Sequence, residues 1–228
     1  MVVDPGPDHD GHLHRVRDQV TAAGQQVAQI LLTHSHPDHS AGAAAFAALT
    51  GAPVLAAAPA FRLGGEGLSP GDTVTAAGGE IHVVATPGHS ADSVCLHLPA
   101  DHALLTGDTV LGRGTTVIAD DGNLTDYLAS LDRLRELTDQ AELAVLLPGH
   151  GPLLTNPATT LDYYISHRHE RLAEVAAALE AGDRTTDQIV ARIYADVDRA
   201  LWPFAAFSVR AALEYLKDQG SLPPGVQQ

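Results

Sequence analysis

The sequence predicts an α/β protein whose last part is helical, and two features of the chain support this prediction. In the first two-thirds of the 228 residues, strand-like apolar runs alternate with helix-like segments, which is typical of layered α/β folds. From about residue 157 the strand signals stop. We therefore expect an α/β domain over residues 1–168 and a small C-terminal helical region over residues 169–228, for which a winged-helix arrangement is one option.

The expected elements follow from apolar runs and from turn and cap residues. Strands are expected at 27–34, 53–58, 80–88, 94–100, 102–108 and 143–150, and helices at 10–23, 40–50 and 125–139. Residues 64–80 are dense in turn residues and predict a loop and a hairpin. Threonine caps and closing glycines predict C-terminal helices over 161–182, 185–197 and 207–220.

Composition narrows the classes of partner. The formal net charge is -15 and Lys217 is the only lysine, which opposes binding to DNA and favours a small molecule over RNA. No apolar run approaches the roughly 20 residues needed to cross a bilayer, and the N-terminus has no basic or apolar targeting region. We expect a cytoplasmic protein without a membrane partner. Cys95, the single cysteine, is expected to be a small buried hydrophobe on a strand.

A dense group of potential metal ligands follows the first strong apolar run. In ILLTHSHPDHSAG, residues 30–42, four such side chains lie within six positions: His34, His36, Asp38 and His39. In an extended segment, residues two apart point to the same side, so His34 and His36 can share one ion while Asp38 and His39 face a second. Imidazole nitrogens and carboxylate oxygens are ligands that zinc accepts where no thiolate is offered.

The same arrangement recurs at three later strand ends. Apolar runs end at His89 in TPGHS, at Asp108 in TGD and at His150 in PGHG, each beside a glycine that lets the backbone pass close to a site. One isolated histidine in a loop is usually structural. Seven potential ligands at four strand ends together predict a dinuclear metal site.

These motifs resemble the signature of the metallo-β-lactamase superfamily. THSHPDH, TPGHS, TGD and PGHG match its later parts, and VVDPG at residues 2–6 is similar to its first part. The resemblance covers residues 2–170 and implies a four-layer αβ/βα sandwich with metals between two sheets. It assigns His34, His36 and His89 to one zinc ion, Asp38, His39 and His150 to the other, Asp108 as the bridge, and Asp4 to a place beside the ligands.

A narrower resemblance concerns the region after Asp108. TGDTVLGRGTT, LTDYLASLDRL, PGHGPLL and YISHRHER resemble the lactamase-like endoribonuclease subgroup, which includes polyketide thioesterases. That subgroup has a C-terminal helical or winged region. Family members have strands before the VVDPG segment, so either the start of this chain is truncated or misassigned, or the protein lacks the N-terminal strands. An uncovered sheet edge makes self-association a hypothesis.

The expected activity is hydrolysis by two zinc ions, with Mn²⁺ or Fe as alternatives. Two ions about 3.5–4 Å apart can share a hydroxide that attacks an electrophilic carbonyl or phosphorus. His34, His36, Asp38, His39 and Asp108 form the expected catalytic set, in which Asp38 also orients the hydroxide. The leading substrate is a small ester, thioester or amide. The alternatives are a phosphodiesterase or endoribonuclease acting on single-stranded RNA, and a glyoxalase II-like thioesterase.

Three further residues are candidates for substrate contact. Arg113 follows Asp108 in a glycine-rich turn, and His167 with Arg168 lies in YISHRHER. The last two could hold an anionic group or protonate a leaving group. A purely structural role at the junction of the two parts is an equal alternative for them.

Overall fold

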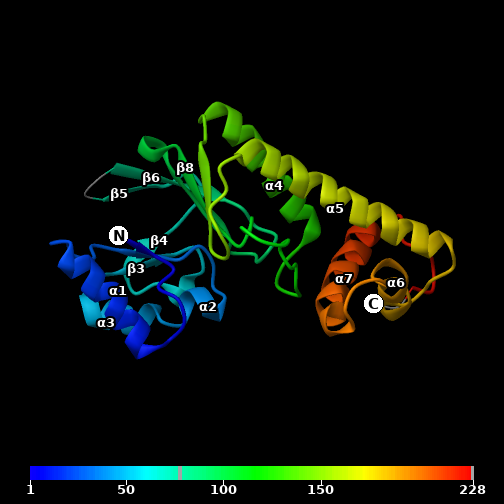
Figure 1. Cartoon of the computed structure of the whole chain (residues 1–228), viewed down its shortest axis with the longest axis horizontal. Helices are drawn as coiled ribbons and strands as arrows, with labels where there is room; N and C mark the ends of the chain where they lie inside the picture. Colours follow the sequence, from blue (N-terminus) through cyan, green and yellow to red (C-terminus); the bar gives the residue numbers. More distant parts are fainter. Residues whose placement is uncertain (77–78, 227–228) are drawn as a thin grey trace.

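The computed structural model describes residues 1–76 and 79–226 and shows two facing β-sheets with helices on both outer sides (Figure 1). The first sheet is parallel, in the order β1-β2-β3-β4. Its strands are β1 (Val2–Val3), β2 (Ile30–Leu31), β3 (Val54–Ala56) and β4 (Gly64–Gly67). The helices α1 (Asp10–Ala22) and α3 (Ala43–Thr50) cover its outer face.

The second sheet runs in chain order from β5 to β9. Its strands are β5 (Thr73–Ala76), β6 (Gly79–Ala85), β7 (Val94–Leu98), β8 (Ala103–Gly107) and β9 (Val145–Pro148). The first four pair antiparallel, whereas β8 and β9 are parallel because α4 (Leu124–Gln140) crosses between them. Short 3₁₀ turns, η1 (Pro59–Phe61) and η2 (Pro99–Asp101), occupy two connections.

Three apolar clusters hold the layers together. Leu13, Ile30 and Phe46 lie in the cluster between α1, α3 and the first sheet. A second cluster, with Leu31 and Leu96, fills the space between the sheets. The third and largest joins the second sheet to the remaining helices. Three cores between four layers confirm the predicted αβ/βα sandwich.

The C-terminal part is helical, as predicted. It contains α5 (Pro157–Glu180), α6 (Thr186–Ile193), the 3₁₀ turn η3 (Arg199–Leu201) and α7 (Trp202–Asp218). Thr185 and Gln188 form a reciprocal capping box that starts α6. The predicted division at 168/169 falls within α5, which runs unbroken from the α4 layer to α6 and α7 (Figure 1).

Three predicted segments differ in detail. Only Ile30–Leu31 of the run 27–34 forms regular strand, because the chain leaves the sheet at Thr33 to place the histidines. The helix expected over 40–50 is preceded by a separate turn, α2 (Pro37–Ser40). In the segment 64–80, expected as a loop and a hairpin, residues 64–67 instead form strand β4 of the first sheet, whereas β5 and β6 pair as the expected hairpin; residues 77–78 lie outside the described part.

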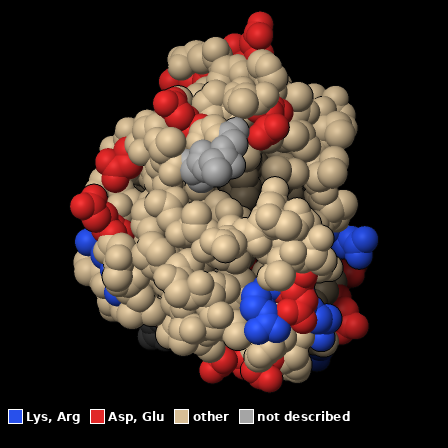
Figure 2. All heavy atoms as spheres, turned by 90° about the vertical axis from the view of Figure 1, so that its left-hand side faces the viewer, with Lys and Arg blue, Asp and Glu red and all other residues tan. Residues whose placement is uncertain are grey.

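The outside of the molecule reflects its acidic composition. Figure 2 shows acidic side chains scattered over one face, with the visible basic side chains in small groups beside acidic ones. Among residues 1–76 and 79–226, no helix combines the length and hydropathy that a membrane crossing requires.

Candidate metal centre

The histidine-rich turn is shaped by a proline. His36 has extended backbone and immediately precedes α2, whose first residue is Pro37, and proline is suited to this position because its missing N–H has no helical acceptor. The extended segment and the first turn of α2 therefore point different side chains at the same space. His34 and His39 are buried, whereas Asp38 remains exposed.

One group of three imidazole nitrogens comes from this turn and from the loop that follows β6. His36 Nδ1 lies 3.1 Å from His34 Nε2 and 3.0 Å from His89 Nε2. Ligands about 2.0–2.1 Å from a tetrahedral zinc lie roughly 3.3 Å apart, so the three nitrogens are spaced to share one ion. The structure therefore brings together the first predicted set, His34, His36 and His89.

A second group lies beside the first. His150 Nε2, from the turn after β9, is 3.0 Å from Asp38 Oδ2 and 3.2 Å from His39 Nε2. The three side chains differ in exposure, because His39 is 3% exposed while Asp38 and His150 are half exposed. A cavity of about 310 Å³ adjoins this group. The second predicted set, Asp38, His39 and His150, is therefore also assembled.

Asp108 stands between the two groups. Its carboxylate lies 3.8 Å from His89 Nε2 on one side, and 3.4 Å and 3.5 Å from the Nε2 atoms of His39 and His150 on the other. Asp108 Oδ1 is buried and has no hydrogen-bond partner among the described residues. A buried carboxylate oxygen without a partner is costly, and a bound cation would remove that cost. The residues present therefore fit a metal centre.

Four of the five histidines are held through the ring nitrogen that faces away from their group. His34 Nδ1 lies 3.0 Å from Thr33 Oγ1, and His89 Nδ1 lies 2.8 Å from the carbonyl oxygen of Val117. The other two pair with carboxylates: His39 Nδ1 is 2.9 Å from Asp4 Oδ2, and His36 Nε2 is 2.8 Å from Asp121 Oδ2. Such partners fix the tautomer and orientation of metal-binding imidazoles.

Asp4 lies beside the ligands, as the resemblance implies, and its carboxylate connects Thr33 with His39. Its Oδ1 accepts the backbone N–H of Thr33 at 2.8 Å, and its Oδ2 accepts the Thr33 hydroxyl at 2.7 Å as well as facing His39. Asp4 has a positive φ of 47°, which is uncommon outside glycine and turns this carboxylate back toward the turn after β2.

Burial and charge set different protonation preferences in the two groups. Burial, with the neighbouring His39 and His89, lowers the pKa of His34 to about 3, and burial also lowers the pKa of His89. Both rings therefore stay neutral near pH 7 and offer a lone pair. Burial opposes charge on His39 too, but the neighbouring carboxylates of Asp108, at 3.4 Å, and Asp4, at 2.9 Å, dominate and raise its pKa to about 10. The carboxylates of Asp4 and Asp108 thus favour positive charge at the second group.

Two glycines allow the close approach of the loops. A side chain at Gly149 would place its Cβ 2.7 Å from Asp108 Oδ1 and 2.7 Å from His39 Cε1. At Gly88, with a φ of 134°, a Cβ would lie 2.3 Å from the backbone of Tyr127. The loops that carry His150 and His89 can therefore pack this closely only because the PGHG and TPGHS motifs have glycine at these two positions.

The three candidates for substrate contact occupy different surroundings. Arg113 is exposed and follows Gly112, whose N–H donates to the His150 carbonyl at 2.8 Å, so its backbone borders the second group. His167 stacks on Tyr163 with ring centroids 5.9 Å apart.

Arg168 does not fit the expectation of substrate contact. Its side chain is buried, it donates through Nη2 to the Thr116 carbonyl, and its guanidinium lies 4.9 Å from the centre of the Tyr127 ring. These contacts tie α5 to the segment after β8 and to α4, so the structure supports the structural alternative for this residue.

Sequence reasoning missed Asp121 and the carbonyl of Val117. Both lie in the irregular segment between β8 and α4, and each supports one histidine of the first group. Asp121 stands in the acidic pair of the ADDGN stretch, which was the only available signal, and nothing in the pattern distinguishes it from Asp120.

Comparisons with known proteins agree with the motifs and the geometry. The family model of the metallo-beta-lactamase superfamily matches residues 1–150, and that of the beta-lactamase associated winged helix domain matches residues 185–221. The lactamase-like protein adaB of Aspergillus niger is 30% identical over 225 residues, covering 90% of this chain and 68% of the relative. An atrochrysone carboxyl ACP thioesterase of Passalora fulva is 30% identical over 212 residues, covering 85% and 59%.

Solved structures show the same fold. A metallo-beta-lactamase family protein from Thermus thermophilus superposes with a TM-score of 0.78 at 22% identity, covering 96% of this chain and 84% of that one. The four-layer sandwich, the motif residues and the family model that matches residues 1–150 lead to one assignment. The chain belongs to the metallo-β-lactamase superfamily.

Proposed function

We propose that this protein is a dinuclear, zinc-dependent hydrolase acting on an ester, thioester or amide bond of a small molecule. One observation carries the proposal. Two groups of three ligand atoms lie side by side, and the carboxylate of Asp108 reaches both of them. A divalent metal is what the fold implies, and the count of two and the choice of zinc are our inference, with Mn²⁺ or Fe as alternatives.

The two groups of ligand atoms would bind one ion each. His34, His36 and His89 would hold one ion, Asp38, His39 and His150 the other, and Asp108 would bridge them. When bound, such ions supply Lewis acidity and make a nucleophile from water available near neutral pH. The mixed donor set of imidazole and carboxylate suits zinc, manganese and iron.

The side chains around the centre have supporting roles in this proposal. Asp38 is half exposed and faces His150, so its carboxylate can orient a water molecule that approaches from solvent. Asp4 and Asp121 keep the imidazoles of His39 and His36 turned toward the centre. Arg113 and His167 are left as candidates for contact with the substrate outside the reacting bond.

A thioester or ester is favoured over a phosphodiester. The relative from Passalora fulva, which is named as a thioesterase, supports this class of bond. The net charge of -15 and the single lysine disfavour a polyanion such as RNA. A preference for a small molecule, a cytoplasmic location and self-association through the β1 edge stay predictions.

A substrate panel tests the proposed function. The zinc-loaded chain is assayed with a β-lactam, S-lactoylglutathione, a simple acyl thioester, bis-nitrophenyl phosphate and single-stranded RNA, with Asp108→Ala as the matched inactive control. We expect cleavage of the acyl thioester that is lost in the variant. Cleavage of RNA or of the phosphodiester alone would favour the nuclease alternative, and selective cleavage of S-lactoylglutathione would favour the glyoxalase II-like one.

A further inference from the structure

A cleft of about 200 Å³ lies where the C-terminal helices meet the segment that follows β8. One wall is α5, and the floor is formed by residues 115–117. The opposite wall runs from Tyr194 to Ser208, which lies in α7. We call this feature the helical cleft.

The α5 wall contains three buried nitrogen atoms that have no hydrogen-bond partner among the described residues. They are His167 Nδ1, Arg168 Nε and Arg171 Nε, and all three residues line the cleft. The two arginine atoms are N–H donors, and the imidazole atom donates when it carries the ring proton. A buried donor without an acceptor costs free energy, so three of them in one wall favour an occupant that accepts hydrogen bonds.

The helical cleft also contains positive charge without a matching carboxylate. Arg168 is 4% exposed, and its guanidinium contacts the Thr116 carbonyl and the Tyr127 ring, with no carboxylate paired to it in the part of the chain that the structure describes. None of the described residues that line the cleft is acidic, although the chain has a net charge of -15. A buried charge is costly without a counter-charge, which an anion in the cleft would supply.

The donors that remain in this wall suit a carboxylate. Arg168 Nη2 donates to the Thr116 carbonyl, and both Nη atoms of Arg171 pair with Glu174. The paired N–H groups with which arginine holds a phosphate are thus engaged in Arg171 and partly engaged in Arg168, and single N–H groups remain for the two oxygens of a carboxylate. His167 and Arg171 are half-buried, so their side chains can turn toward such a group.

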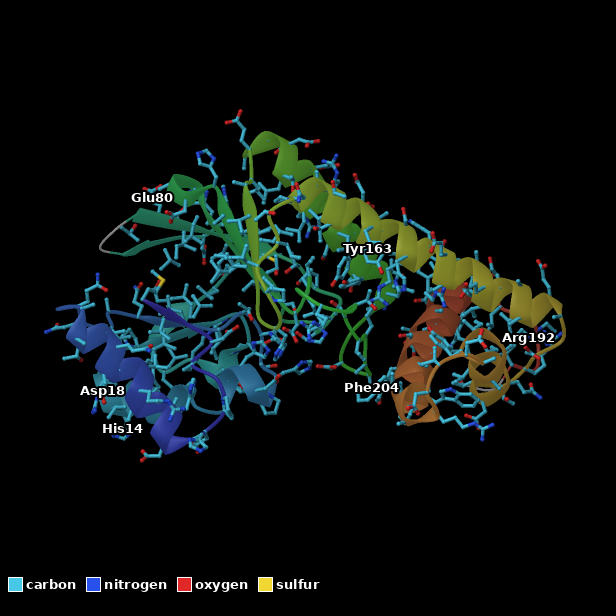
Figure 3. All side chains as sticks on the ribbon, viewed as in Figure 1. His14, Asp18, Glu80, Tyr163, Arg192 and Phe204 are labelled. Atoms are coloured by element: carbon cyan, nitrogen blue, oxygen red, sulfur yellow. The ribbon has the colours of Figure 1, made fainter. Side chains whose placement is uncertain are left out.

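The opposite wall of the helical cleft is apolar. Among the described residues six large hydrophobic side chains are exposed, and three of them line this wall: Val197 at 37%, Leu201 at 52% and Phe204 at 55%. Figure 3 shows Phe204 on the side of α7 that faces the α/β domain. Exposed apolar groups concentrated in a concave place indicate a binding site rather than ordinary surface. The cleft therefore offers hydrogen-bond donors on one side and apolar contact on the other.

We propose that the helical cleft binds the anion of a small organic acid, with its carboxylate against the α5 wall and a short apolar tail against Leu201 and Phe204. The volume of about 200 Å³ is below the roughly 300–1,000 Å³ of a pocket for a drug-sized ligand, so the acid is about as small as hexanoate. This inference goes beyond the proposed function, because residues 115–117 separate the cleft from the metal centre. It assigns His167 to this second site rather than to the substrate.

The single tryptophan of the chain provides a local signal for the test. Trp202 stands beside Leu201 at the start of α7, and its Nε1 donates to the Val197 carbonyl at 3.2 Å, so its fluorescence reports on the apolar wall. The zinc-loaded chain is titrated with hexanoate, its neutral analogue hexanamide, acetate and inorganic phosphate at constant ionic strength. We expect saturable binding of hexanoate, with a dissociation constant about tenfold or more below that of each other compound, since a hydrogen bond to a charged group contributes about this factor.

Three variants and a matched control locate the bound acid. Arg171→Gln should weaken hexanoate about tenfold or more, and Phe204→Ser about threefold. Arg135→Gln is the control, because Arg135 on α4 is 28% exposed and paired with an acidic side chain at 2.8 Å, as Arg171 is, but does not line the cleft. Asp108→Ala should bind hexanoate as the original chain does, because the metal centre is not part of this site.

Several results would overturn the proposal. These are no saturable change with hexanoate, equally tight binding of hexanamide or phosphate, an equal loss in Arg135→Gln, or a loss in Asp108→Ala, which would place the acid at the metal centre. Self-association in sedimentation that Arg171→Gln removes, without binding of hexanoate, would assign the donors to a carboxylate of a second copy. The comparison of hexanoate with hexanamide needs no variant, so it tests the proposal even if Arg171→Gln does not fold.

Discussion

Replacement of Asp121 by alanine is expected to weaken metal binding about tenfold. Asp121 Oδ2 lies 2.8 Å from His36 Nε2, and this contact turns His36 Nδ1 toward His34 and His89. Loss of a carboxylate partner of a metal-binding histidine typically lowers metal affinity by about 10- to 100-fold. The Asp121 side chain is 50% exposed and solvent screens the pair, so the lower limit applies, about 1.4 kcal/mol.

Competition with a chromophoric chelator measures this effect without reference to any substrate. Zinc affinity is compared among the original chain, Asp121→Ala, Asp121→Asn and Asp120→Ala. The asparagine amide oxygen can still accept from His36, so we expect only about a threefold loss in that variant. Asp120 is the matched control, because it is the adjacent acidic residue and is exposed. An affinity of Asp121→Ala within twofold of the original, or an equal loss in Asp120→Ala, would refute the reasoning.

Four other predictions concern the centre and the core. Asp108→Ala and His36→Ala should each abolish turnover and lower the metal content, and retained activity in both would contradict the assigned site. Burial raises the pKa of Cys95 to about 11, so the native thiol should resist a disulfide reagent at pH 8 and react only after unfolding; prompt reaction would contradict its burial. The pKa of Cys95 in the folded chain exceeds the unfolded value of 9.0, so the contribution of the thiol to the free energy of unfolding should be lost as pH rises from 9 to 11. In urea titrations, Cys95→Ala should show a smaller decrease in the free energy of unfolding over this pH range. Tyr164→Phe removes a buried hydroxyl that accepts the Leu111 N–H at 2.9 Å and should lower the free energy of unfolding by about 1–3 kcal/mol, whereas an unchanged urea midpoint would contradict that role.

The ligand set could be predicted because its residues stand in short motifs at strand ends. Parallel and adjacent strands bring their ends to one edge, so His89, Asp108 and His150 meet the histidine-rich turn without further information from the sequence. The three apolar clusters similarly follow from apolar runs that alternate between strand and helix periodicity.

Other parts of the site depend on irregular chain and could not be predicted. The carbonyl of Val117 is a backbone group, which any residue type supplies equally. Asp121 is 85 residues from His36, and the loop geometry that joins them leaves no periodic pattern.

The burial of Arg168 could have been predicted from the helical spacing of apolar residues in α5, which the resemblance of the YISHRHER segment led us to overlook. Leu161, Tyr164, Arg168, Leu172 and Val175 are all buried and follow one another at helical spacing along α5. This places Arg168 on the stripe that faces the core. An interpretation by helix periodicity, rather than by resemblance of the YISHRHER segment, predicts the buried contact that the structure has.

The content of metal per chain tests the central claim most directly. The purified protein is freed of metal with a chelator, reloaded with zinc, passed through a desalting column and analysed by inductively coupled plasma mass spectrometry, with thioester cleavage measured on the same samples. We predict two zinc ions per chain in the active protein, about one or fewer in His36→Ala, and no cleavage before reloading. Undiminished cleavage by the metal-free chain, or active protein that retains no metal, would contradict the account.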